Sequence, residues 1–283
     1  MPMNPLRKID QPEITALLFA QENSAHRPCL ADAEDVLFEI DPGISLHCRF
    51  YFAAQDAPVL FVYPATAGNF HSFDAVAEDY RRQGMNIFLT SYRGCGENSG
   101  SPSVSAMYAD SEKLLHLAID WLSGKSCFGP YFVMGQSLGS TCAIDTVVKN
   151  EDSLKGLILE SGICDTASFL GALGASTAQA DIAEEEGFNT LEKIEKIKIP
   201  TLIFHGARDG LVAIAEAENL QASSGARTKQ FFVIPGAEHH TVGKTGGELY
   251  IKTIKQFIDT VSGVNTWRQK RREHKSMRKN QAS

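Results

Sequence analysis

Residues 131–148 read YFVMGQSLGSTCAIDTVV, and the stretch from Gly135 to Gly139 has the pattern Gly-x-Ser-x-Gly. A short apolar run precedes the pattern, and apolar residues recur at helical spacing after it. The expected order is therefore strand, sharp turn and helix, with Ser137 at the turn. A serine in a strained turn needs small neighbours two positions before and after it, because strand and helix approach closely there. This context predicts an exposed serine nucleophile; the alternative is a chance match in a loop of Gly and Ser.

Outward from this turn, apolar runs alternate with helical patterns. We expect strands at 36–40, 44–52, 58–63, 86–91, 131–134, 156–160, 201–205 and 230–234, and helices at 12–20, 71–83, 104–123, 138–149, 213–222 and about 247–261. The first two strands are joined by Asp-Pro-Gly, which predicts an antiparallel pair. The alternation that follows predicts a mostly parallel central sheet with helices on both faces, whose ligands bind at the carboxyl ends of the strands.

Bulk composition is that of a soluble globular protein, with 43% hydrophobic and 22% charged residues in 283. Six cysteines are scattered without metal-like spacing, which indicates free thiols and a cytoplasmic location. No apolar run approaches the length of a membrane-spanning helix, and the N-terminal stretch MPMNPLRKIDQPE has no apolar core of signal-peptide length, so we expect neither. No cluster of His, Cys, Asp or Glu has ligand spacing, and we expect no metal and no cofactor.

Charge is uneven along the chain. The net charge is −7, yet residues 264–283 hold seven Lys and Arg residues and one Glu. We therefore divide the chain into an N-terminal extension (1–34), one domain (35–262) and a basic tail (263–283). The tail has no apolar periodicity, and we expect a solvated, partly disordered arm. Binding of that arm to nucleic acid or to an anionic surface is a second interpretation.

Five motifs occur in a characteristic order. They are YPATAGN at 63–69, YRGCGENSG at 92–100, GQSLG at 135–139, HGARDGLV at 205–212 and PGAEHH at 235–240. With these motifs the chain resembles the serine α/β-hydrolase superfamily over roughly residues 35–262, and looks similar to its esterase-like members. The resemblance implies an α/β-hydrolase fold with a short lid at about 162–196. That segment contains Phe169, Leu170 and Leu173, so it is expected to form a modest acyl pocket or, alternatively, a plain pair of surface helices.

The family order of nucleophile, acid and base is satisfied by Ser137, Asp209 and His239. By resemblance, Asp209 stands where the family places its acid; the structural alternative is a cap for the helix near 213. Glu160 is the second candidate acid, because some members carry theirs after that strand. The family pattern Gly-Ala-x-His assigns the base to His239, and His240 is the alternative one residue later.

Two donors are needed for the oxyanion of the tetrahedral intermediate. The resemblance assigns one to the backbone N–H of Leu138 and the other to the loop after residue 63. Many members have His-Gly in that loop, whereas this chain has Pro64-Ala65, and proline has no N–H. Aligning the following residues places Thr66 at the second donor position; alternatively, Thr66 only begins the next helix. Arg93 is expected to tie loops together rather than to bind an acidic substrate.

These residues together predict a serine hydrolase. We expect it to cleave small carboxylic esters or thioesters through an acyl-enzyme, with a small acyl compound as its substrate. The competing hypothesis is a binding or regulatory protein that keeps the fold without turnover. All three triad residues are present, which favours the enzyme, and the missing His-Gly favours the alternative.

Overall fold

The computed structural model describes residues 5–19, 32–65 and 70–264. Thr66 and nearly all of the basic tail, from residue 265 onward, therefore lie outside the described residues.

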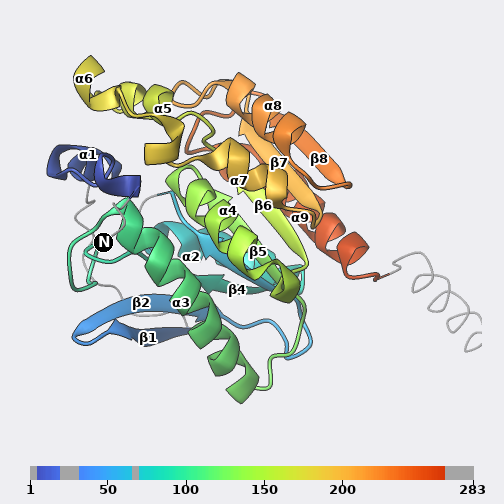
Figure 1. The fold of residues 1–283 in the computed structure, drawn as a ribbon. Coiled ribbons are helices and arrows are strands. Elements are labelled where there is room, and N and C mark those ends of the chain that lie inside the picture. Colours follow the sequence, from blue (N-terminus) through green and yellow to red (C-terminus); the bar gives the residue numbers. More distant parts are fainter. Residues whose placement is uncertain (1–4, 20–31, 66–69, 265–283) are drawn as a thin grey trace, which may run out of the picture.

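One eight-stranded sheet organises the described residues (Figure 1). Its strands are β1 (Ala33–Asp41), β2 (Ile44–Tyr51), β3 (Val59–Tyr63), β4 (Asn86–Leu89), β5 (Tyr131–Gln136), β6 (Gly156–Glu160), β7 (Thr201–Gly206) and β8 (Lys229–Ile234). Their order across the sheet is β1-β2-β4-β3-β5-β6-β7-β8. Pairing is antiparallel from β1 to β2 and from β2 to β4, and parallel from β4 to β8. The expected mostly parallel α/β-hydrolase sheet is confirmed.

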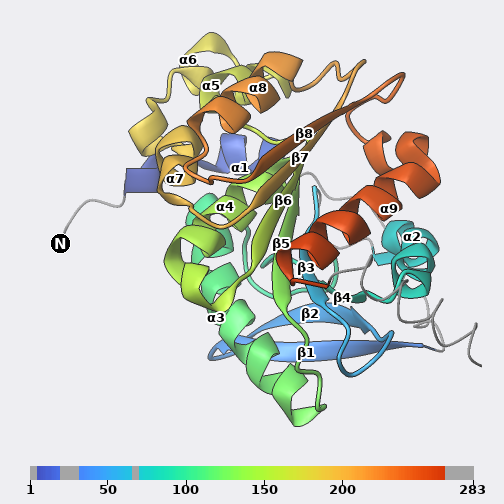
Figure 2. The same ribbon diagram turned by 90° about the vertical axis from the view of Figure 1, so that its right-hand side faces the viewer.

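Helices cover both faces of this sheet. They are α1 (Pro12–Leu18), α2 (Phe70–Arg82), α3 (Val104–Gly124), α4 (Leu138–Asn150), α5 (Thr166–Ala172), α6 (Thr177–Ala180), α7 (Thr190–Lys196), α8 (Ile214–Ser223) and α9 (Val242–Val261), with short 3₁₀ turns at Pro5–Arg7, Glu151–Ser153 and Glu184–Glu186. Figure 2 shows the sheet edge-on, with α2 and α9 on one side and α3, α4 and α7 on the other. Each side has its own apolar core, because central strands such as β3 and β6 bury every residue and supply side chains to both faces.

Two segments differ from the sequence-based expectation. The helix expected from about 247 is preceded by a further helical stretch from Val242, and the two are joined by a kink at Gly247, whose φ of +52° and ψ of −136° are not helical. The segment 162–196 contains α5, α6 and α7, and its Phe169 and Phe188 are buried in the core on the side of α3 and α4. The sequence missed this packing because the short apolar runs of the segment are separated by Gly, Ala and acidic residues.

The N-terminal residues pack against the body. Ile14 and Leu18 of α1 are buried, and α1 contacts α5. The Asp10 carboxylate accepts a hydrogen bond of 2.7 Å from the backbone N–H of Val104, at the start of α3. A carboxylate at a helix N-terminus satisfies an N–H that has no acceptor within the helix.

Among the described residues, no helix combines the length and the apolar character needed to span a lipid bilayer. The described cysteines (Cys48, Cys95, Cys127, Cys142 and Cys164) are buried free thiols.

Candidate active site

Ser137 lies between the end of β5 and the start of α4, at φ +49°. Its two flanking glycines are required by close packing. A Cβ on Gly139 would lie 2.1 Å from the backbone oxygen of Tyr63, and one on Gly135 would lie 2.4 Å from the backbone oxygen of Gly139. The Ser137 N–H donates to the backbone oxygen of Glu160 at the end of β6 (2.9 Å). The turn therefore has the strained, closely packed form expected of a nucleophile elbow.

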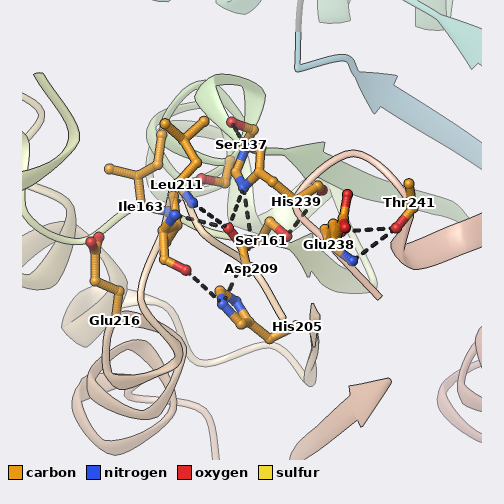
Figure 3. Close-up of polar contacts among 12 residues, drawn as sticks. Ser137, Ser161, Ile163, His205, Asp209, Leu211, Glu216, Glu238, His239 and Thr241 are labelled. Carbon is orange, nitrogen blue, oxygen red and sulfur yellow. Dashed lines mark hydrogen bonds and ion pairs between the residues drawn. The ribbon is translucent and has the colours of Figure 1, made fainter. Parts of the chain in front are cut away.

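His239 connects Ser137 to Asp209 (Figure 3). Its Nε2 lies 2.7 Å from Ser137 Oγ, and its Nδ1 lies 2.8 Å from Asp209 Oδ2. The three residues come from loops after β5, β7 and β8, which all end at the same edge of the sheet. Structure thus brings together the three residues selected from the sequence, in hydrogen-bonding contact.

The Asp209 carboxylate is almost fully buried, with a side chain 1% exposed. Its Oδ1 accepts the backbone N–H groups of Leu211 and Val212, at 3.0 and 2.9 Å. Burial alone would raise the pKa of Asp209, but hydrogen bonds from His239 and from the backbone outweigh it and lower the pKa to about 2. Asp209 therefore stays ionised. It does not cap α8, whose N-cap residue is Ala213 and lacks a side-chain capping bond.

A second histidine lies beside this acid. The His205 Nε2 is 3.0 Å from the backbone oxygen of Val212 and 3.6 Å from Asp209 Oδ2. Burial lowers the pKa of His205 below its ordinary value, although Asp209 acts in the opposite direction. His205 therefore packs behind the acid in its neutral form.

Glu160, the alternative acid, makes different contacts. Its Oε1 accepts a hydrogen bond of 3.0 Å from Gln136 Nε2, and its Oε2 accepts one from the Tyr250 hydroxyl. Burial raises the pKa of this carboxyl, whereas the hydrogen bonds from Tyr250 and Gln136 and the electrostatic effect of His239 act to lower it. The geometry thus favours Asp209 as the partner of His239. Sequence reasoning missed this network, because Tyr250 lies 90 positions further along the chain and nothing local marks it.

The remaining candidates lie around this centre. The His240 ring packs edge-on against that of His239, with centroids 4.6 Å apart. Leu138 is the first residue of α4, where backbone N–H groups have no intrahelical acceptor, and Thr66 lies outside the described residues. Arg93 donates to Asp110 (2.8 Å) and Asp41 (2.7 Å), so it ties α3 to the end of β1, in line with a structural role.

A cavity of about 980 Å³ opens beside Ser137 and His239. Its walls come from α2 and from the first half of α9, and its larger apolar lining residues are Phe70, Phe73, Val76, Tyr80, Leu89, Tyr250 and Ile251. Its charged lining residues on these two helices are Asp79, Arg82, Lys244 and Glu248. Glu160 and Gln136 also line it. None of its described lining residues belongs to 162–196. The segment therefore does not line this cavity, and its Phe169, Leu170 and Phe188 side chains lie in the core on the opposite side of the sheet. Its role as a lid stays a prediction.

Comparison with known proteins places the chain among hydrolases. Residues 57–182 and 185–245 match the family described as "Serine aminopeptidase, S33". An α/β hydrolase domain-containing protein of Arabidopsis thaliana, WAV2, is 29% identical over 245 residues, which cover 80% of this chain and 78% of that protein. Protein bem46 of Schizosaccharomyces pombe is 30% identical over 218 residues, covering 75% of this chain and 70% of the relative.

Solved structures of similar fold include an esterase and a lipase. A Pyrococcus furiosus esterase, Pf2001, superposes with a TM-score of 0.66 at 16% identity, covering 85% of this chain and 96% of that one. A monoacylglycerol lipase of Paleococcus ferrophilus gives a TM-score of 0.60 at 15% identity, covering 76% and 99%. At such identities the likeness concerns the fold.

Proposed function

This chain belongs to the family described as "Serine aminopeptidase, S33", within the α/β-hydrolases, and we propose that it is a serine hydrolase that cleaves small carboxylic esters or thioesters through an acyl-enzyme. The observation that carries the proposal is the bridge formed by His239 between the Ser137 hydroxyl (2.7 Å) and the Asp209 carboxylate (2.8 Å). A serine hydroxyl becomes a useful nucleophile only when a base accepts its proton, and this bridge provides the base and its orienting carboxylate.

In the first half of the reaction, Ser137 Oγ attacks the substrate carbonyl carbon while His239 Nε2 takes the hydroxyl proton. Asp209, held ionised by its three donors, stabilises the imidazolium that forms. The imidazolium then gives its proton to the departing alcohol or thiol. The bond between the carbonyl carbon and the leaving group breaks, and the acyl group remains as an ester on Ser137.

In the second half, water repeats the attack on this ester. His239 accepts a proton from the water, and the same proton returns to Ser137 Oγ when the acid product leaves. In both halves the developing oxyanion is stabilised by the N–H of Leu138, at the positive end of the α4 dipole. We assign the second donor to Thr66, as the alignment of its loop suggests.

The cavity supports a substrate with an apolar portion. Its volume of about 980 Å³ is in the range of small-molecule sites, and aromatic and aliphatic side chains form much of its wall. The buried free thiols of the described residues fit a reducing compartment such as the cytoplasm.

A fluorophosphonate probe tests the proposal directly, since it reacts covalently with an activated serine. We expect labelling of the full chain, assigned to Ser137 by peptide mass spectrometry, and no labelling of Ser137→Ala. Ser140→Ala is a matched control, because Ser140 is another buried serine, three residues after Ser137 and in α4. If folded wild-type protein stays unlabelled, the enzyme hypothesis fails and the non-catalytic alternative replaces it.

A panel of p-nitrophenyl esters with acyl chains of increasing length then measures turnover. We expect kcat/KM to rise with chain length until the cavity is filled, because each buried methylene contributes about 0.8 kcal/mol. A preference for acetate over every longer chain would contradict the assignment of this cavity to the substrate.

A further inference from the structure

Glu160 lines the cavity, but the Ser137–His239–Asp209 arrangement does not need it for catalysis. The residue is 7% exposed and lines the same cavity as Ser137 and His239. Its backbone oxygen accepts the N–H of Ser137, which fixes Glu160 next to the candidate nucleophile. A carboxylate is therefore held within the substrate cavity close to the reacting centre.

The side-chain hydrogen-bond partners of Glu160 among the described residues are both neutral, the amide of Gln136 and the hydroxyl of Tyr250. Moving a carboxylate out of water is unfavourable unless a cation or several hydrogen bonds compensate. Burial accordingly raises the pKa of Glu160. By contrast, the buried Asp145 has two lysines, with Lys193 at 2.7 Å and Lys149 at 3.0 Å. Among the described residues, His239 acts on Glu160 electrostatically, and Arg82 and Lys244 line the same cavity, but none of them forms an ion pair with the Glu160 carboxylate. Glu160 can therefore accept a cation that enters the cavity.

We propose that the Glu160 carboxylate binds a primary ammonium group of the substrate, so that the enzyme takes esters or thioesters whose acyl or leaving portion ends in an amine. The proposal rests on the serine-hydrolase function above and names its substrate class. Tyr250 and Gln136 orient the carboxylate, and its remaining lone pairs accept the ammonium hydrogens. The apolar walls from α2 and α9 contact the methylene stem that joins the ammonium group to the ester.

Binding of two simple ligands tests this without any turnover. n-Hexylammonium and 1-hexanol share a six-carbon stem, and only the first carries a charge at pH 7.5. Titration calorimetry with the wild-type chain should give a Kd for n-hexylammonium at least about tenfold below that for 1-hexanol, as expected for a charge-assisted hydrogen bond. The titrations are made at about 0.3 M salt, where attraction to the acidic surface of the protein is screened.

Variants then locate the site. Glu160→Gln should lose the ammonium preference, whereas Glu216→Gln should keep it. Glu216 is a matched control: it is a buried carboxylate that accepts backbone N–H groups, here from Cys164 and Asp165, but it does not line the cavity. A second variant, Gly243→Val, shields Glu160 and should also weaken ammonium binding. A Cβ at Gly243 would lie in ordinary contact with Tyr250 (3.4 Å) and 3.8 Å from Glu160 Oε2.

Equal affinities of the wild-type chain for the two ligands would overturn the proposal. An ammonium preference that survives in folded Glu160→Gln would overturn it as well, because the cation would then bind elsewhere. If Glu160→Gln does not fold, Gly243→Val is measured in its place, and an ammonium preference that it leaves unchanged would overturn the proposal. None of these outcomes affects fluorophosphonate labelling of Ser137, so failure of this inference is distinct from failure of the proposed function. An acyl-side pair, p-nitrophenyl 6-aminohexanoate and p-nitrophenyl heptanoate, tells which portion of the substrate carries the amine.

Discussion

Replacement of Asp209 by Asn should remove most of the activity for a reason that the hydrogen bonds specify. Asp209 Oδ1 accepts the N–H groups of Leu211 and Val212, and Oδ2 faces His239 Nδ1 at 2.8 Å. In the variant, the side-chain oxygen keeps the two backbone bonds, and the NH₂ group takes the place of Oδ2. A donor then faces Nδ1, which forces the His239 proton onto Nε2. That nitrogen can no longer accept the proton of Ser137.

The expected loss follows from this change of tautomer. Comparable triads lose about 10⁴-fold in kcat, or about 5 kcal/mol of transition-state stabilisation, when the carboxylate becomes an amide. The assay is steady-state hydrolysis of p-nitrophenyl butyrate at pH 7.5, with the melting temperature measured in parallel. Glu216→Gln serves as the control, because it makes the same chemical change at another buried carboxylate.

The reasoning would be refuted if folded Asp209→Asn kept more than about a tenth of wild-type turnover. A large loss in Glu160→Gln together with nearly full activity in Asp209→Asn would instead transfer the acid role to Glu160. Both variants are therefore measured side by side, on the same substrate.

Three further predictions concern the fold. Gly139→Ala should lower the free energy of unfolding in urea by about 3 kcal/mol or more, because its Cβ would lie 2.1 Å from a backbone oxygen. Gly171→Ala, which has open space around it, should change that free energy little. Equal effects of the two substitutions would contradict the close approach of strand and helix at Gly139. Because the pKa of Asp209 is about 2 in the folded chain and near 4 in the unfolded chain, this carboxylate stabilises the fold above pH 4, and the contribution is lost as pH falls towards 2. Asp209→Asn should therefore flatten that part of the curve of unfolding free energy against pH. An unchanged curve would refute the lowered pKa of Asp209. Removal of residues 265–283 should leave melting temperature and ester turnover unchanged at high salt; loss of folding at every ionic strength would show that the segment belongs to the core.

Sequence alone indicated the fold class and named Ser137, Asp209 and His239 as the candidate triad, with Glu160 left open as an alternative acid. Both depend on local patterns: apolar runs for buried strands, and Gly-x-Ser-x-Gly for a tight turn after a strand. Ser137, Asp209 and His239 each follow an apolar run, and parallel strands bring their carboxyl ends to one edge of the sheet. The sequence pattern indicated parallel strands whose carboxyl ends lie at one edge, whereas the order of the strands, which brings the three residues within hydrogen-bonding distance, came from the structure.

Only the tertiary structure decided which carboxylate orients the histidine and which elements surround the cavity. Glu160 and Asp209 both follow strands, and the choice between them depends on side-chain directions that no local pattern encodes. Similarly, the sequence does not tell whether the apolar residues of 162–196 line a pocket or lie in a core. In the structure this segment packs against α4 and α8, and these residues lie in the core. The cavity lies instead between α2 and α9. These two helices are about 170 positions apart in the chain, so no short stretch of sequence indicates that they are in contact.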